Sequence, residues 1–406
     1  MLTLGPRTSF WTAAAVAGLA LWGSGAPTVI YPLYAHEWGL SAGDTSAIFA
    51  IYPIVLILVL ILFGNLSDAK GRRFTILLGL AAMAVGSVIF GLAPDLIAVF
   101  VGRALMGVGV GLSLSPATAA MVEFGGPTGA ARASSTTTAS TATGLALATL
   151  VGGALVEYAP APLHLTFWVL FGVVVVVGCA AWFLPRHTRD DSAPRWRPRP
   201  LSVPRGLRMA VAAGALGISS AFALGAVYLA LGALIASDLV HSDNAFVNGA
   251  VLAICAAVIG IVAILARRLA PRKALLFGPM ATLIGLGLMV ESGVAHSLFL
   301  FVLASVAGGA GYSLLFSGGL GVLTAAAPAH HRAGVISSAY VVGYLAQAIA
   351  ALGLGALATA HGLELAIVVG APIIVLIGVA ALIVSRFGIF GFREHAESSM
   401  MTVTRT

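Results

Sequence analysis

Charged residues are scarce in this sequence: Asp, Glu, Lys and Arg make up only 9% of its 406 residues, whereas 60% are apolar. A water-soluble domain needs about a quarter of its residues charged to cover its surface. The composition therefore excludes a cytosolic enzyme, a nucleic-acid-binding protein and a disordered scaffold, and it leaves a polytopic membrane protein. The formal net charge of +7 lies in short clusters between long apolar runs, so we expect these clusters to face a membrane rather than nucleic acid.

Cysteine is nearly absent as well, and both Cys179 and Cys255 lie inside apolar runs, which leaves neither a disulfide framework nor a zinc site. The chain also lacks the G-x-x-x-x-G-K-[ST] phosphate loop, the H-E-x-x-H motif and any Ser/His or His/Asp cluster within an apolar run. These absences exclude an intrinsic ATP-driven motor. We expect no enzymatic activity, no metal and no bound cofactor.

Long apolar runs are what the chain has in abundance. A bilayer core of about 30 Å takes about 20 helical residues to cross, and twelve stretches approach or exceed that length. The fifth is the weakest because it is rich in Ser and Thr, a composition that suits a helix packed among others. The twelve predicted spans are residues 10–33, 46–66, 74–93, 97–121, 133–157, 163–184, 208–236, 247–266, 274–292, 297–323, 334–358 and 364–385.

The distribution of arginine and lysine predicts the orientation, because positively charged short loops stay in the cytoplasm. With both termini on one side, twelve spans give that side 20 of the 21 basic residues and give the opposite loops none. We expect a multi-pass protein of a bacterial cytoplasmic membrane with both termini in the cytoplasm. The 20 residues are Arg7, Lys70, Arg72, Arg73, Arg132, Arg186, Arg189, Arg195, Arg197, Arg199, Arg205, Arg208, Arg267, Arg268, Arg272, Lys273, Arg332, Arg386, Arg393 and Arg405.

The longest polar stretch, residues 186–207, is rich in proline and arginine and is typical of an extended linker. It separates six spans in residues 1–185 from six in residues 208–390, and residues 391–406 would form a cytoplasmic tail. Two basic loops recur at an offset of 200 residues, which favours an internal duplication over a chance coincidence of basic loops. The pairs are Arg72-Arg73 with Arg272-Lys273, and Arg132-Ala133 with Arg332-Ala333.

The loop after the second span reads Gly64-Asn65-Leu66-Ser67-Asp68-Ala69-Lys70-Gly71-Arg72-Arg73. It resembles the signature loop G-x-L-A-D-R-x-G-R-R/K of the major facilitator superfamily of secondary transporters, with Ser67 and Ala69 as departures. The resemblance implies an all-α membrane protein with twelve transmembrane helices in two pseudo-symmetric six-helix bundles, which moves a small molecule by alternating access. The matching positions are Gly64, Leu66, Asp68, Gly71, Arg72 and Arg73.

This loop has a physical interpretation of its own. Gly64 would permit a close helix approach, Gly71 a tight turn, and Asp68 would form a charge cluster with the two arginines. In the family such a cluster acts as a latch between the halves, and Glu123 stands where the family often supplies a further acid. The alternative is that Asp68 and Glu123 merely offset an arginine-rich surface, since exposed pairs contribute little.

Arg103 is the one basic residue inside a span, at a depth of roughly 10 Å. With Gly107 and Gly109 it resembles the family motif R-x-x-x-G-x-G, whose arginine is linked to proton coupling or to an anionic group. The alternative is an arginine that snorkels outward or caps backbone carbonyls. In the fifth span, Gly144, Gly152 and Gly153 are a remnant of a glycine motif of family exporters, and this remnant favours export.

In the family the cavity is lined mainly by helices 1, 4, 7 and 10. The resemblance therefore implies a substrate cavity with aromatic rings and hydroxyl groups around one arginine, suited to a mid-sized amphipathic or weakly acidic molecule. For each aromatic residue, packing against lipid or another helix is an alternative of equal weight. The candidates are Trp22, Tyr31, Arg103, Ser113, Tyr228, Tyr312, Ser313 and Phe316, joined by Tyr344 and Gln347 of the eleventh span.

No acidic residue lies in the middle of any predicted span. Either an acid near a span end lies deeper than expected, or coupling passes through Arg103 and the substrate charge, or the protein is an uncoupled facilitator. We predict a monomeric transporter with a small-molecule substrate that uses the proton gradient to export a drug-like compound or metabolite. The alternative is uptake or facilitated diffusion of a small organic solute or anion.

Overall fold

The computed structural model describes residues 3–64, 66–126, 129–185, 205–327 and 329–403, and all regular structure in these ranges is helical. The first half contains α1 (Pro6–Gly25), η1 (Thr28–Ile30), α2 (Tyr31–Trp38), α3 (Ala42–Phe63), α4 (Leu66–Lys70), α5 (Arg72–Gly91), α6 (Leu96–Phe124), α7 (Gly129–Tyr158) and α8 (Leu165–Trp182). The second half contains η3 (Arg205–Leu207), α9 (Arg208–Ala226), η4 (Val227–Leu231), α10 (Gly232–Leu234), η5 (Ile235–Leu239), α11 (Ala245–Leu265), η6 (Ala266–Arg268), α12 (Pro271–Val294), α13 (Leu298–Ala326), α14 (Ala329–His361) and α15 (Leu363–Val403).

Within the described ranges, twelve helical segments are long and apolar enough to cross a membrane, which confirms the predicted fold class. The first runs over Pro6–Trp38 and the seventh over Arg208–Leu239, so both extend beyond their predicted ends. The last helix, α15, continues unbroken through Val403, past the boundary predicted at residue 390. The predicted linker lies outside the described residues except for the turn η3.

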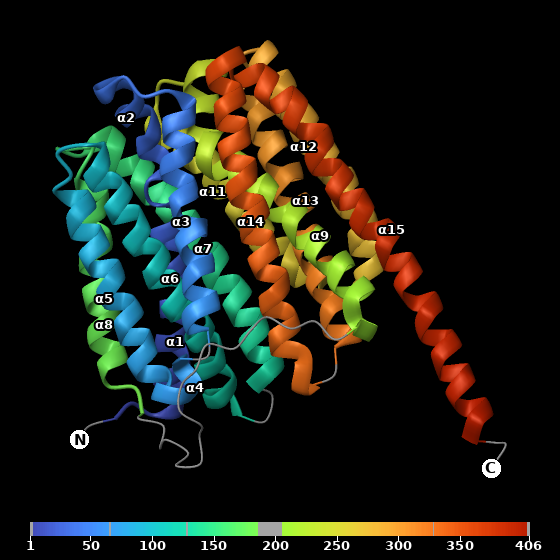
Figure 1. Ribbon diagram of the computed structural model, residues 1–406. Helices are drawn as coiled ribbons and strands as arrows, with labels where there is room; N and C mark the ends of the chain where they lie inside the picture. Colours follow the sequence, from blue (N-terminus) through green and yellow to red (C-terminus); the bar gives the residue numbers. More distant parts are fainter. Residues whose placement is uncertain (1–2, 65, 127–128, 186–204, 328, 404–406) are drawn as a thin grey trace.

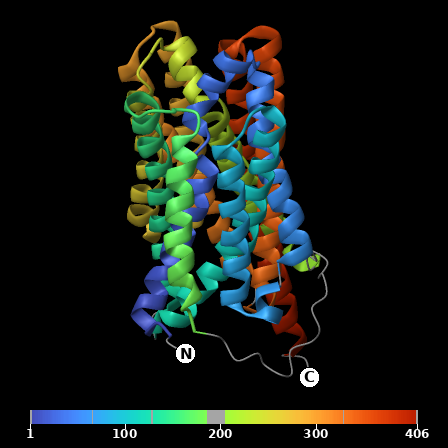
Figure 2. The ribbon, with the colours of Figure 1, turned by 90° about the vertical axis from the view of Figure 1, so that its left-hand side faces the viewer.

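Both chain termini lie at the same end of the molecule, as an even number of spans requires (Figures 1 and 2). The two halves meet where α3 packs against α14 and where α7 packs against α11. The first and seventh spans are the central ones, because 83% and 89% of the residues in their most apolar 18-residue stretches are buried. The sixth and twelfth spans, each 28% buried, are peripheral and present most of their surface to lipid.

The two halves are alike in two details. Arg73 at the start of α5 donates to the carbonyl of Leu184 at 3.4 Å, and Arg272 at the start of α12 donates to the carbonyl of Ser385 at 3.3 Å. The first and seventh spans are also interrupted at corresponding places, by the 3₁₀ turn η1 and by the π-helical turn η4. Breaks of this kind free backbone groups and often mark functional sites.

Candidate functional site

Arg103 lies on α6 with its side chain fully buried, at a relative exposure of 0%, so it does not snorkel to a membrane surface. Its Nη1 donates to the carbonyl of Ser24 at 2.8 Å and reaches that of Gly23 at 3.5 Å. Gly23 lies four residues before Pro27, which has no N–H, so the Gly23 carbonyl lacks its usual helical donor. The break in the first span therefore supplies acceptors that hold this arginine.

The remaining faces of the Arg103 guanidinium group meet aromatic rings of α3. Its Cζ lies 4.7 Å from the ring centroid of Tyr52 and 5.3 Å from that of Phe49. Nε and Nη2 are buried without a hydrogen-bond partner, and no carboxylate in the described part of the chain forms an ion pair with them. Because a buried, unpaired cation is costly, this site favours an anionic group or an ordered water beside the two N–H donors.

Two tyrosines that follow the break add further polar groups. Tyr31 and Tyr34 on α2 are buried, and neither hydroxyl group has a hydrogen-bond partner in the structure. Tyr31 lies close enough to Arg103 to interact with it electrostatically. Trp22 on α1 is only partly buried. Tyr31 thus lies within electrostatic range of Arg103, and two hydroxyl groups near the break have no partner.

An aromatic cluster lies in the second half of the chain, centred on Phe222 of α9. The Phe222 ring centroid lies 4.7 Å from that of Tyr344, 5.9 Å from Phe316, 6.3 Å from Tyr312 and 6.4 Å from Tyr340, residues contributed by α13 and α14. We call these five residues the aromatic cluster. It offers several ring faces to a flat apolar group.

The aromatic cluster of the second half lies near the arginine region of the first half, because α3, which carries Tyr52, packs against α14, which carries Tyr344. The hydroxyl group of Tyr52, which packs on Arg103, lies close enough to Tyr312 and Tyr344 for electrostatic interaction. A Cβ added to Gly225 would lie 3.0 Å from the Tyr312 ring and 3.8 Å from Nε2 of Gln347, so these two side chains also lie together. Buried Oε1 of Gln347 has no hydrogen-bond partner in the structure.

Three of the predicted cavity residues lie at helix–helix contacts. The Tyr228 hydroxyl group donates to the carbonyl of Ala304 at 2.8 Å, and the Ser313 hydroxyl group donates to that of Ile259 at 2.9 Å. Ser113 is fully buried, and its Cβ lies 2.9 Å from the place that a Cβ on Gly79 of α5 would take. These side chains connect helices of the same half, and we leave them out of the proposed cavity.

The acids near the ends of the spans mostly cap helices. Asp44 forms a capping box with Ser41, and Asp95 accepts a bond from the Ala98 N–H at 2.9 Å. Glu157 on α7 accepts a bond at 2.8 Å from the N–H of Ala245, the first residue of α11. Their positions at helix ends argue against any of these acids lying deep in a span.

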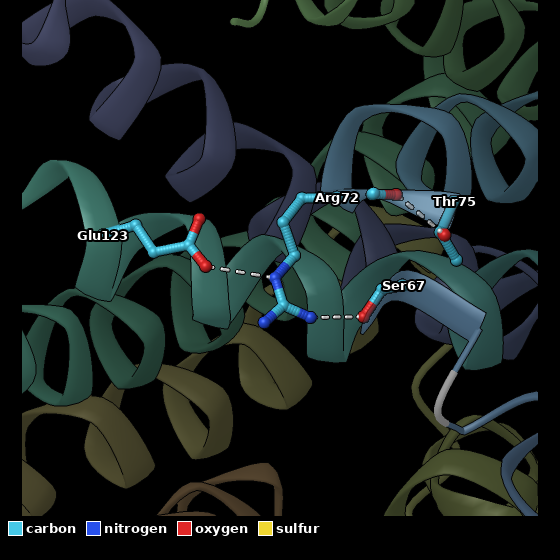
Figure 3. Close-up of polar contacts among 5 residues, drawn as sticks. Ser67, Arg72, Thr75 and Glu123 are labelled. Atoms are coloured by element: carbon cyan, nitrogen blue, oxygen red, sulfur yellow. Dashed lines mark hydrogen bonds and ion pairs between the residues drawn. The ribbon is translucent and has the colours of Figure 1, made fainter. Parts of the chain in front are cut away.

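The loop after α3 carries a small polar network (Figure 3). Arg72 donates from Nε to Oε1 of Glu123 on α6 at 3.2 Å and from Nη1 to the Ser67 hydroxyl group at 2.5 Å. The structure therefore joins two of the predicted latch residues directly, and Arg72 also bonds Ser67, a serine that the family motif lacks. Gly71 has φ +92°, which requires glycine, and its carbonyl accepts a bond from Thr75 Oγ1 at 3.1 Å (Figure 3).

Other residues of the loop make contacts that the sequence did not predict. The Cζ of Arg73 lies 5.2 Å from the ring centroid of Trp182 on α8, and its Nη1 donates to the carbonyl of Leu184. The three atoms nearest to a Cβ on Gly64 all belong to Leu60 of its own helix. The side chain of Asp68 lies outside the described residues.

The glycines of α7 lie at helix contacts. A Cβ on Gly144 would collide with the carbonyl of Gly18 on α1, and one on Gly152 would lie 2.8 Å from Cγ2 of Val29. A Cβ on Gly153 would lie 2.6 Å from the carbonyl oxygen of Ala245 in the second half. Small residues thus let α7 approach both the broken first span and the opposite half.

Contacts between the halves are found at the end opposite the termini. The Gly43 N–H at the start of α3 donates to Oγ1 of Thr359 near the end of α14 at 2.8 Å, and Glu157 contacts Ala245 as described above. At this end the ribbons of α3 and α14 lie side by side (Figure 1).

Sequence reasoning overlooked several residues around the arginine and in the aromatic cluster. Pro27 in the first span is the signal for the exposed carbonyls of Gly23 and Ser24. Tyr52, Phe222 and Tyr340 had no such signal, because an aromatic residue in an apolar run packs against lipid, protein or ligand with the same local pattern.

Comparisons with known proteins identify the family. A model of the Major Facilitator Superfamily matches residues 10–294. The uncharacterized MFS-type transporter EfpA of Mycobacterium tuberculosis is 32% identical over 158 residues, which cover 37% of this chain and 30% of that protein. The multidrug efflux pump LfrA of Mycolicibacterium smegmatis is 34% identical over 129 residues, 31% of this chain and 25% of that protein. The match thus covers about a third or less of each relative.

Solved structures share the fold over nearly the whole chain. A bacterial homologue of the human lysosomal transporter Spinster, in an inward-facing and unoccupied conformation, has a TM-score of 0.75 at 14% identity and covers 95% of this chain and 98% of its own. The nucleoside transporter NupG has a TM-score of 0.71 at 12% identity and covers 93% of this chain and 99% of its own. At these identities the likeness shows the fold alone.

Proposed function

The chain belongs to the major facilitator superfamily of membrane transporters, and we propose that it exports a mid-sized amphipathic compound from the bacterial cytoplasm in exchange for protons. It is a multi-pass membrane transporter and not an enzyme. The observation that carries the proposal is Arg103, fully buried between an opened helix and aromatic rings, with two N–H donors unpartnered.

Two matched relatives support the export direction. One is named a multidrug efflux pump, and the puromycin resistance protein pur8 of Streptomyces alboniger is 29% identical over 169 residues, 41% of this chain and 33% of that protein. The glycine remnant in α7 favours the same direction. Because each match covers about a third or less of the relative, the drug-like substrate is part of the proposal.

The charge distribution and the contacts between the halves support an inward-open state. By the positive-inside rule the end with the termini is cytoplasmic, and the opposite end is closed by the contacts of Gly43 with Thr359 and of Glu157 with Ala245. In the outward-open state the halves would close on the cytoplasmic side. The Arg72–Glu123 pair, which lies within one half here, stabilises the loop that would form that closure.

The site supports a substrate with two chemical features. A carboxylate or another anionic group would pair with Nε and Nη2 of Arg103, while a flat apolar body would stack on the aromatic cluster opposite. Because an arginine side chain stays charged, exchange for protons would also require another group of the protein, which takes up a proton at the outer side as the anion leaves Arg103 and releases it into the cytoplasm.

A second candidate function is facilitated diffusion or uptake of an organic anion without protons. The positions of three acids near the span ends favour this function. Asp44, Asp95 and Glu157 bind the N-terminal ends of helices, which keeps them at the membrane surface. Arg103 would bind the anion in both schemes, so the distinction lies in proton movement alone.

The export proposal is tested by accumulation in a host strain that lacks its own efflux pumps. Cells that express the wild type should accumulate less of an amphipathic aromatic acid than cells that express Arg103→Met, while Arg267→Met, at an exposed arginine, should match the wild type. Equal accumulation in the wild type and Arg103→Met for every acid, zwitterion and cation in the panel would overturn it. Higher accumulation in the wild type would indicate uptake instead.

A further inference from the structure

An apolar groove runs along the outer face of the first half, between α5 and α8. It encloses about 430 Å³ and is lined by apolar side chains and by Gly178 and Cys179. Val175 and Trp182, two of its lining residues, are 42% and 59% exposed. Helix α8 is the peripheral sixth span, and α5 packs beside it, so this groove opens toward lipid. It lies apart from the arginine region and the aromatic cluster.

The length of the groove matches one leaflet. It extends along α8 from Val174 to Trp182, nine residues whose ends lie about 12 Å apart along the helix axis. Half of the hydrocarbon core of a bilayer is about 15 Å thick. The Trp182 end belongs to the cytoplasmic half of the bilayer in the proposed orientation, because Trp182 ends α8 beside the start of α5.

The cytoplasmic end of the groove carries positive charge. The Arg73 guanidinium group lies 5.2 Å above the Trp182 ring, at the height of the lipid headgroups. Lys70, at the end of α4 and three residues before Arg73, is exposed. Arg7 is exposed as well, and it follows Leu4, whose N–H donates to the carbonyl of Phe183 at the end of α8. Cationic side chains beside a membrane surface attract anionic lipid headgroups.

We propose that this groove binds one anionic phospholipid of the cytoplasmic leaflet, whose acyl chain lies between α5 and α8 and whose phosphate faces Arg73. The two parts of the site are complementary to the two parts of such a lipid. Arg73 keeps its contacts with Trp182 and Leu184 and contributes its charge.

The test uses the purified full-length protein, stripped of loosely held lipid and titrated with phosphatidylglycerol or phosphatidylcholine, with bound lipid counted by native mass spectrometry. The wild type should hold one phosphatidylglycerol about five-fold more tightly than phosphatidylcholine. Arg73→Gln should lose this preference, whereas Arg272→Gln, which removes the corresponding carbonyl contact in the second half, should keep it.

Filling the groove tests the acyl-chain part. No atom lies within 4 Å of a Cβ on Gly178 or on Gly172, so Gly178→Phe should fill the groove, and Gly172→Phe should fold equally well while leaving the groove open. We expect Gly178→Phe to lose the tightly held lipid and Gly172→Phe to retain it. Equal affinity of the wild type for both lipids, or full retention by Gly178→Phe, would overturn the proposal.

A second readout does not depend on a substitution in the groove. Cys179 lies in the groove and is exposed, whereas Cys255 is buried. Phosphatidylglycerol should slow alkylation of Cys179 by a maleimide at least several-fold more than phosphatidylcholine does. An alkylation rate that responds equally to both lipids would contradict the site even if the groove variants failed to fold.

Discussion

Replacing Arg103 by methionine should leave the protein nearly as stable as the wild type while abolishing transport. The substitution removes two buried nitrogen donors without partners, Nε and Nη2, each of which costs about 1–3 kcal/mol. It also removes one strong hydrogen bond to the Ser24 carbonyl, worth about 1.5–3 kcal/mol, and two contacts with aromatic rings, worth about 0.5–1 kcal/mol each. These terms roughly cancel, so we expect a net loss of no more than about 1 kcal/mol.

The assay is thermal unfolding followed by a thiol-reactive dye, in a Cys179→Ser background so that only buried Cys255 reports. Phe167→Ala serves as the comparison, because this fully buried ring stacks at 4.3 Å on Phe90, and such a truncation costs about 3–5 kcal/mol. Arg103→Met should melt near the wild type and well above Phe167→Ala. If it melted as low as Phe167→Ala, Arg103 would be a structural carbonyl cap, and its proposed role in binding would be refuted.

Three further predictions concern helix contacts and the loop. Gly144→Ala should lower the melting temperature markedly, because its Cβ would collide with the carbonyl of α1, whereas Gly172→Ala on α8 should not, since its Cβ meets open space; an unchanged melting temperature for Gly144→Ala would show that α1 and α7 can separate. Glu123→Gln should slow transport but lower the free energy of unfolding by no more than about 1 kcal/mol, because the pair with Arg72 is partly exposed. Full transport by this variant would show that Glu123 merely offsets the charge of an arginine-rich surface. Gly43→Cys with Thr359→Cys should form a disulfide that stops transport until a reductant is added, because these residues join the halves at the closed end; transport that continues in the oxidised protein would contradict closure at this end.

The fold could be predicted from the sequence because its signals are long and redundant. Twelve apolar runs, a one-sided distribution of arginine and lysine, and a motif loop all require the same topology. The span ends were less predictable where helices break: Pro27 interrupts the first span without ending it, and the π-helical turn at Val227–Leu231 carries no proline or charge to mark it.

The site could be predicted only in part, for a physical reason. A charge in an apolar run stands out, so Arg103 and Glu123 were identified from sequence alone. A hydroxyl group or a ring does not reveal its direction: Ser113 and Tyr228 lie on the expected helices, yet they contact neighbouring helices, whereas Phe222 was overlooked at the centre of the aromatic cluster. Which side of a buried helix faces the cavity depends on the packing of all twelve spans.

The most direct test of the central claim is proton movement in inverted membrane vesicles that hold an imposed pH gradient. A panel of amphipathic aromatic acids, drugs and sugars is added one compound at a time, and compound flux is measured by mass in the same vesicles. Proton antiport predicts that at least one compound collapses the gradient with the wild type and that none does with Arg103→Met. Compound flux that leaves the gradient unchanged would contradict proton coupling and establish facilitated diffusion.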